Sequence, residues 1–134
     1  MSYTISQAAQ KAGVSVYTLR YYDKEGLLPF LDKKPDGTRV FKDSDFAWLK
    51  TIDCLKDTGM SIREIREFVG LCMQGDATLA ERLAILRQHQ EDFEKKMAEM
   101  EHHRETIRKK VQYYSEAVEA GTESVHLEKE KEER

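Results

Sequence analysis

The cysteines and histidines, which are common nucleophiles, bases and metal ligands, number two and four in this chain. The cysteines, Cys54 and Cys72, could form only one bridge, and no CxxC motif or Cys/His cluster offers a metal site. On a helix, the adjacent His102 and His103 would point about 100° apart. We therefore expect free thiols and no metal or other cofactor. The histidines are expected on the surface: His89, His102, His103 and His126.

A local group of basic and hydroxyl-bearing side chains lies near the beginning of the chain. Residues 15–22, SVYTLRYY, combine hydroxyl groups with a guanidinium, and residues 1–42 carry seven Lys or Arg against four Asp or Glu. The whole chain has a net charge of −3. A local basic surface with hydroxyl donors is typical of a DNA-binding site, although the charge alone would fit an ordinary protein surface.

Two short helices are expected to position these side chains. Thr4-Ile-Ser-Gln7 has the form of a capping box, and the helix that it begins would end at Gly13. Ser15 can cap a second helix that ends at Gly26. The short Gly-Val-Ser turn between them predicts a helix-turn-helix. Its seam would be filled by Ala9, Val14 and Leu19.

A hairpin and two further helices would complete the domain. Pro35-Asp36-Gly37 predicts a turn between strands that contain Phe30 and Leu31 on one side and Val40 and Phe41 on the other, forming a wing. Asp43 can cap a third helix that stops near Gly59. Ser61-Ile-Arg-Glu64 is a second capping box, and its helix would end at Gln74-Gly75-Asp76. We expect residues 1–76 to form one domain.

From Thr78-Leu-Ala-Glu81, a third capping box, apolar residues recur at alternating spacings of four and three, which is typical of a coiled coil. A helix over residues 77–120 would be roughly 60 Å long, and nothing else in the chain could cover its apolar stripe. We expect a second copy to supply the partner helix in a two-fold dimer. Polar Gln90 and Arg104 either set the register or lie where the helices separate. The apolar positions, called the coil seam below, are Leu79, Leu83, Leu86, Phe93, Met97, Met100, Ile107, Val111, Tyr114 and Val118.

Composition limits the remaining possibilities. The chain has 134 residues, of which 35% are charged and 40% hydrophobic, and only two are prolines, so a mainly α protein is expected. It has no apolar run long enough to span a membrane, and its first residues lack the features of a secretory signal, so we expect a cytoplasmic protein. Residues 121–134 form a charged segment that we expect to be disordered.

Three stretches resemble the MerR family of bacterial transcription regulators: GVSVYTLRYYDKEGLL, the wing PDGTRVF, and LKTIDCLKDTGMSIREIREFV. The tandem tyrosines followed by Asp and Gly-Leu-Leu are the most specific feature. The resemblance implies a mainly α fold, with a winged helix-turn-helix DNA-binding domain followed by a long dimerising coiled-coil helix. It also implies a homodimer that binds an inverted repeat in double-stranded promoter DNA, and that affects RNA polymerase indirectly, by distorting the promoter. Such a protein would act at the nucleoid of a bacterial cell.

The N-terminal residues of a recognition helix normally reach base edges, which makes Tyr17 and Thr18 the candidates here, with Ser15 at the helix start. Many family members have a basic residue in place of Tyr17. The resemblance implies DNA contacts for Arg20 and Tyr22. One tyrosine of an adjacent pair normally faces the core, and we expect it to be Tyr21, although its hydroxyl could also contact DNA.

On the wing, the resemblance implies a contact between Arg39 and the DNA backbone. Lys33 and Lys34 flank this position, where they either contact DNA or are simply solvated. Family members often have tyrosines in place of Val40 and Phe41, so this wing has fewer hydroxyl donors.

Features that are missing from the chain limit the kinds of signal to which such a regulator could respond. Only 13 residues follow Gly121, which leaves no room for a separate drug-binding domain. The cysteines that metal-responsive relatives carry at the end of the dimer helix are also missing. The segment IDCLKDTGMSI resembles the aldehyde- and electrophile-responsive branch, whose members carry a sensory cysteine in this region.

Cys54 is therefore the candidate sensor. Lys50 and Lys56 would favour its reactive thiolate, whereas Asp53 and Asp57 would oppose it. A single cysteine is more often a packing residue, and that alternative stays open for Cys54. Cys72 is expected to be structural.

Two other functions remain open. The chain could be an architectural DNA-binding protein without an effector, or a thiol oxidoreductase that uses Cys54 and Cys72. No spacing pairs a nucleophile with a base, so we do not expect an enzyme. A pure coiled-coil scaffold would leave the arrangement of Arg20, Tyr21, Tyr22 and Arg39 unexplained.

Overall fold

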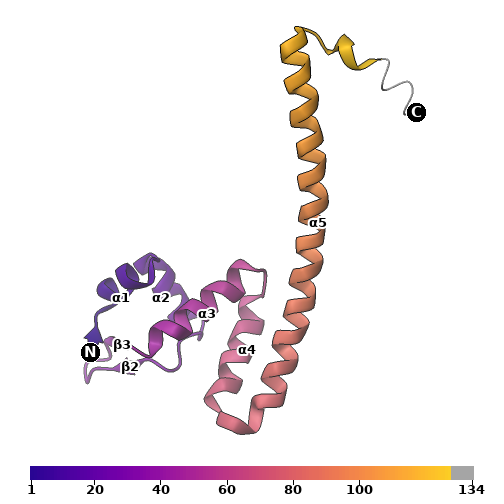
Figure 1. Cartoon of the computed structure of the whole chain (residues 1–134). Coiled ribbons are helices and arrows are strands. Elements are labelled where there is room, and N and C mark those ends of the chain that lie inside the picture. The colour runs from indigo at the N-terminus through magenta and orange to yellow at the C-terminus, as the bar shows by residue number, and fades with distance from the viewer. Residues whose placement is uncertain (128–134) are drawn as a thin grey trace. The chain divides into compact units, whose positions relative to one another are not determined.

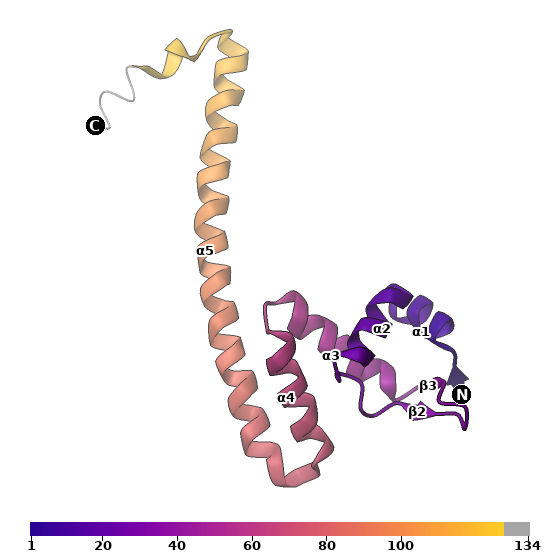
Figure 2. The ribbon, with the colours of Figure 1, turned by 180° about the vertical axis from the view of Figure 1, so that it is seen from behind.

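Two short helices and a small sheet open the chain, and longer helices follow (Figures 1 and 2). The computed structural model describes residues 1–127. It divides the chain into two compact units, one ending at Glu91 and one beginning at Asp92. The elements are β1 (Ser2–Tyr3), α1 (Ile5–Ala12), α2 (Val16–Lys24), β2 (Asp32–Lys33), β3 (Arg39–Lys42), α3 (Asp45–Asp57), α4 (Ile62–Met73), the 3-10 turn η1 (Gly75–Thr78), α5 (Leu79–Ala120) and the 3-10 turn η2 (Glu123–His126).

The predicted helix-turn-helix is confirmed. Thr4 and Gln7 form a reciprocal capping box, and α1 ends at Gly13, whose φ of 70° is in the left-handed region that glycine adopts without strain. The Ser15 hydroxyl accepts the backbone N–H of Thr18 and caps α2. Ser61 caps α4 in the same way, through the backbone N–H of Glu64.

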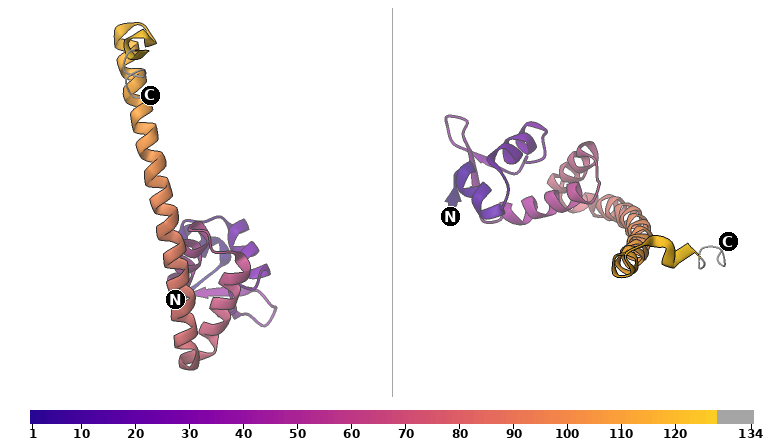
Figure 3. Two further views of the ribbon diagram at one scale, coloured as in Figure 1. Left: turned by 90° about the vertical axis from the view of Figure 1, so that its right-hand side faces the viewer. Right: turned by 90° about the horizontal axis from the view of Figure 1, so that it is seen from above.

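The wing is part of a three-stranded antiparallel sheet with the order β1-β3-β2. Residues 34–38 form the predicted turn, and the Asp36 carboxylate accepts the backbone N–H of Thr38, which lowers the pKa of Asp36. Figure 3 shows this turn extending beyond the neighbouring helices. The first strand was expected to contain Phe30 and Leu31, but it begins at Asp32, because Leu31 is buried in the core and Phe30 stacks on Trp48. The two-residue strand β1 was not predicted.

The core of the first unit is formed where α1, α2, α3 and α4 meet the sheet. The helix α1 contributes the small buried residues Ala8 and Ala9, and the large buried side chains come from α2, β3, α3, α4 and the segment between α2 and β2. They include Leu19, Tyr22, Leu27, Leu28, Phe41, Ile52, Ile65 and Val69.

Two predicted helix caps are wrong. Ser44, not Asp43, is the N-cap of α3, and the Ser44 side chain makes no capping hydrogen bond. The Asp43 carboxylate instead accepts a hydrogen bond from the Tyr3 hydroxyl. Thr78 does not form a capping box with Glu81. The Thr78 hydroxyl donates to the carbonyl oxygen of Leu71 (2.6 Å) and accepts from Arg82 Nε (3.1 Å), so it ties the end of α4 to the start of α5.

The tyrosine that faces the core is Tyr22, not Tyr21. Tyr22 is 1% exposed and its hydroxyl donates to Asp53 Oδ1 over 2.5 Å, whereas Tyr21 is only half-buried. Burial and the hydrogen bond to Asp53 raise the pKa of Tyr22 above its ordinary value. The helical spacing of three that separates Leu19 from Tyr22 explains the choice, because both side chains point to the same face of α2.

α5 begins in the first unit and continues through the second, and the side chains of the coil seam are 36–80% exposed along its whole length. No described helix is both long and apolar enough to cross a membrane.

The segment after Gly121 is not disordered throughout. Residues 123–126 form η2, which is capped by the Thr122 hydroxyl, and His126 is buried rather than on the surface. The His126 ring stacks on Tyr113 at 4.1 Å, and its Nε2 lies 2.9 Å from the carbonyl oxygen of Tyr113. Residues 128–134, the rest of the predicted disordered segment, lie outside the described residues.

The buried Tyr22 hydroxyl should make the free energy of unfolding fall at alkaline pH. At pH 8 we expect Tyr22→Phe to lower the free energy of unfolding by about 1–2 kcal/mol, because the hydrogen bond to Asp53 is lost. Above pH ~10 the unfolded state loses the phenolic proton while the native state retains it, so the wild type loses stability and the difference shrinks. Chemical denaturation at pH 8 to 11 measures this, with the exposed Tyr17→Phe as the control. Parallel curves for the wild type and Tyr22→Phe would contradict it.

Candidate nucleic-acid interface

The outer face of α2 carries the side chains that the sequence singled out. Tyr17 is 79% exposed, Arg20 is exposed and Thr18 is half-exposed. No described residue makes a hydrogen bond or an ion pair with the side chain of Tyr17 or Arg20. A phenol and a guanidinium that are exposed and unbonded on one short helix are available to a ligand outside the protein.

Ser15 and Thr18 add a hydroxyl pair at the start of α2. Their oxygens lie 2.8 Å apart, and Ser15 Oγ also accepts the backbone N–H of Thr18. Because only one proton is needed for the bond between the hydroxyls, the second remains available as a donor. Backbone amides and hydroxyls at a helix start are well suited to an anionic oxygen.

The wing contributes the second group of cations. Lys33 and Lys34 are exposed near the turn. Arg39 Nε donates to Asp23 Oδ2 over 3.2 Å, in an ion pair in which both side chains are about 30% exposed. This ion pair joins the wing to α2, so Arg39 positions the two elements and keeps its terminal amino groups for another partner.

Three polar contacts hold the C-terminal half of α2 to three different elements. The Arg39–Asp23 ion pair joins it to β3, and the Tyr22–Asp53 hydrogen bond joins it to α3. Arg66 on α4 donates to the backbone carbonyl and the carboxylate of Glu25, the residue that ends α2. The exposed face of α2 is therefore held in a fixed orientation.

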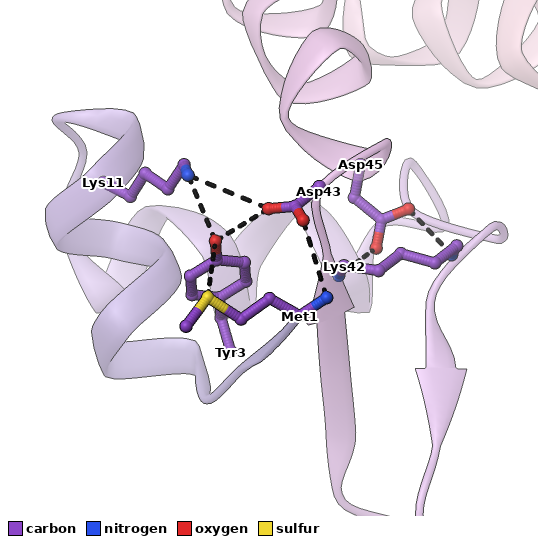
Figure 4. Close-up of polar contacts among 6 residues, drawn as sticks. All are labelled: Met1, Tyr3, Lys11, Lys42, Asp43 and Asp45. Atoms are coloured by element: carbon purple, nitrogen blue, oxygen red, sulfur yellow. Dashed lines mark hydrogen bonds and ion pairs between the residues drawn. The ribbon is translucent and has the colours of Figure 1, made fainter.

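The base of the wing is held by a buried carboxylate (Figure 4). Asp45, whose side chain is only 2% exposed, accepts the backbone N–H of Lys42 (3.0 Å) and its ammonium group (2.8 Å). Lys42 Nζ also donates to the carbonyl oxygen of Phe30. This pairing fixes the end of β3 to the start of α3.

A second polar cluster joins β1, α1 and the β3–α3 connection (Figure 4). The Tyr3 hydroxyl donates to Asp43 Oδ1 at 2.7 Å and accepts from Lys11 Nζ at 3.2 Å. The amino group of Met1 lies 3.5 Å from Asp43. The Tyr3 hydrogen bond lowers the pKa of Asp43.

The predicted site residues fall into two groups. On the outer surface, α2 brings together Ser15, Tyr17, Thr18, Arg20 and part of Tyr21, and the wing presents Lys33 and Lys34. The predicted DNA contact of Tyr22 does not fit this structure, because its hydroxyl is buried against Asp53. Cys54 is exposed, so packing does not explain it, whereas Cys72 is half-buried against the core; both are free thiols.

Sequence reasoning did not find Asp23, Asp45 or Arg66 as residues that support the interface. Asp23 and Arg66 pair with residues that only the tertiary fold brings near, and Asp45 pairs with Lys42, which is three residues earlier in the chain. Among residues 1–127, no three His, Cys, Asp or Glu side chains form a group that could hold a metal ion.

A helix-turn-helix with an exposed second helix, flanked by a wing with lysines, defines a winged helix-turn-helix protein of the DNA-binding class. Comparison of the sequence with protein families supports this class. Residues 3–70 match the MerR HTH family regulatory proteins, and residues 46–110 match the MerR DNA-binding region. The chain belongs to the MerR family.

The similarity to individual relatives covers most of the chain. It is 39% identical over 122 residues to an uncharacterized HTH-type transcriptional regulator of Haemophilus influenzae, covering 91% of this chain and 90% of that one. It is 38% identical to the regulator YyaN of Bacillus subtilis, covering 84% and 91%. The crystal structure of HiNmlR, a MerR family regulator lacking the sensor domain and bound to promoter DNA, superposes with a TM-score of 0.85 at 38% identity, covering 93% of this chain and 99% of that one.

Proposed function

We propose that this protein is a transcriptional regulator that binds promoter DNA through α2 and the wing. The observation that carries the proposal is the set of exposed side chains on the outer face of α2, a helix fixed from behind by β3, α3 and α4. The DNA-bound structure of HiNmlR, which is similar over almost the whole chain, supports it. As a bacterial regulator it would act at the nucleoid in the cytoplasm.

Each group in the interface has a distinct proposed role. Tyr17 and Thr18 read base edges in the major groove, while Ser15, Arg20 and Tyr21 bind phosphates. Lys33, Lys34 and the terminal amino groups of Arg39 contact the backbone beside the wing. Because phosphate contacts fix register and base contacts carry sequence information, Arg20 sets affinity and Tyr17 sets preference.

The regulator acts as a homodimer on an inverted repeat. The first unit buries its own core, whereas the coil seam leaves ten large apolar side chains at least 36% exposed. Exposed apolar residues repeated at heptad spacing need a partner helix, and a second copy supplies an identical one. Two recognition helices then meet two half-sites, and the dimer controls transcription by distorting the DNA between them. RNA polymerase is affected only through the promoter.

The regulator responds to aldehydes or other thiol-reactive electrophiles through Cys54. The thiol is exposed on α3, the helix whose Asp53 holds Tyr22 of α2. Addition of the thiol to an aldehyde forms a C–S bond, and the thiol proton ends on the former carbonyl oxygen. The added group would change the surface of α3 next to the residue that anchors α2.

A regulator is favoured over an enzyme because the relatives are transcriptional regulators. An architectural protein without an effector is the alternative within the DNA-binding class, and it predicts DNA bending without any response to an electrophile.

Arg20→Ala tests the DNA interface. We expect lower affinity for the inverted repeat upstream of its own or a neighbouring gene, and a slope of log K against log salt that is smaller by about 1, because one phosphate contact is lost. Fluorescence anisotropy across a salt series measures both. Arg87→Ala, which changes an exposed arginine on α5, serves as the control. If the wild type binds random DNA as tightly as the repeat, the proposed function is wrong.

Met97→Asp tests the dimer. A carboxylate buried in the coil seam without a partner should weaken dimerisation by roughly 100-fold, equivalent to about 3 kcal/mol. Sedimentation equilibrium should find the wild type as a dimer and the variant as a monomer at low micromolar concentration. Ala98→Asp, on the same helix but outside the seam, should remain dimeric. A monomeric wild type would contradict the proposal.

Cys54→Ser tests the sensor. Adding an aldehyde should change promoter output from the wild type and from Cys72→Ser by several-fold, and leave output from Cys54→Ser unchanged, because only the exposed thiol reacts. In vitro transcription measures the output, and mass spectrometry after brief labelling with iodoacetamide, which forms a stable thioether, shows whether prior aldehyde addition protects Cys54. An equal response from Cys54→Ser would show that this thiol is not the sensor.

A further inference from the structure

A cavity of about 370 Å³ opens between α1, α2 and α3. It lies on the side of α2 opposite to the exposed side chains of Tyr17 and Arg20. The interface described above does not use this cavity. Its volume is in the range of sites that hold small organic molecules. It is lined by Lys11, Ala12, Val14, Leu19, Tyr22, Phe46, Leu49, Lys50 and Asp53.

The walls of the cavity are apolar. Leu19 and Leu49 are buried side chains from α2 and α3, and the ring of Phe46 and the side chain of Val14 pack against the same core. An apolar cavity about 150 Å³ in size can already hold a benzene ring. The occupant should therefore have a compact apolar body, such as one or two aromatic rings.

The three charged side chains around the cavity differ in whether they are already paired. Lys11 Nζ donates to Tyr3, lies 3.9 Å from Asp43 and sits over the rings of Tyr3 and Phe46. Asp53 Oδ1 accepts the hydroxyl of Tyr22.

Lys50 differs from both. It is exposed, and no carboxylate within residues 1–127 pairs with its ammonium group. Lys50 is therefore the charged side chain of this cavity whose polar group has no described hydrogen-bond or ion-pair partner, and the group on a ligand that matches its ammonium is an anion.

We propose that this cavity binds a small amphipathic monoanion, an arylcarboxylate, with the aromatic body against Val14, Leu19, Phe46 and Leu49 and the carboxylate on Lys50. The ligand would touch Leu19 and Tyr22, the residues through which α2 packs on the core.

Titration of the full-length protein with 2-naphthoate, followed by amide NMR, tests the site. Saturable shifts are expected at Val14, Leu19 and Leu49. Lys50→Met keeps the aliphatic stem but removes the charge, and should weaken naphthoate binding by roughly fivefold. The neutral analogue 2-naphthalenemethanol should bind the wild type and Lys50→Met equally. Lys33→Met, on the wing, is the matched control and should leave naphthoate affinity unchanged.

Asp53→Asn gives the opposite test of charge. Its amide oxygen can still accept from Tyr22, and removing the negative charge should strengthen naphthoate binding. The proposal is overturned if naphthoate causes no saturable shift at the cavity, if the shifts lie on the coil seam instead, or if Lys50→Met weakens both ligands equally. None of these results depends on DNA, so a failure here is distinct from a failure of the proposed function.

Discussion

The hydrogen bond between Tyr22 and Asp53 is the constraint on which the candidate DNA interface depends. α2 has nine residues, and an isolated helix of that length is not stable in water. Its conformation must come from tertiary contacts, and burial of Leu19 and Tyr22 supplies them. The phenol can be buried because its hydroxyl reaches Asp53, so no polar group is left without a partner.

The burial of Leu19 and Tyr22 divides α2 into an inward and an outward face. Residues 19 and 22 point inward at a spacing of three, which leaves positions 17 and 20 on the outward face. Asp23 and Glu25 then lie where they can pair with Arg39 and Arg66, so acidic residues within a basic segment serve to position it. The Lys42–Asp45 pair does the same for the wing, since it holds β3 to the first turn of α3.

The two units of the chain satisfy their apolar residues in different ways. The first unit buries a core of its own, contributed by α1 to α4 and the sheet. Along α5, by contrast, the coil seam remains exposed although the helix is regular and its C-terminal end is held by η2 and the buried His126. The proposed dimer would cover this seam with an identical helix, and it is also the assembly that the proposed inverted repeat would require.

Local patterns in the sequence determined most of the fold. Capping boxes, glycine stops, the Pro-Asp-Gly turn and the heptad spacing act over a few residues, so they identify α1, α2, α4, the wing and α5 without knowledge of the fold. The tandem tyrosines indicated the family, and the exposed row of α2 was recognised from the types of its residues.

Tertiary structure alone decided which partner each polar side chain finds. Helical spacing puts Tyr22 on the same face of α2 as Leu19, but only the fold brings Asp53, 31 residues away, opposite its hydroxyl. Asp43 does not cap α3 because Tyr3 holds it, and β1 exists only because β3 offers it an edge. The exposure of Cys54, the burial of His126 and the cavity beside Lys50 likewise depend on which helices pack together, since burial and pairing are set by contacts between residues far apart in the chain.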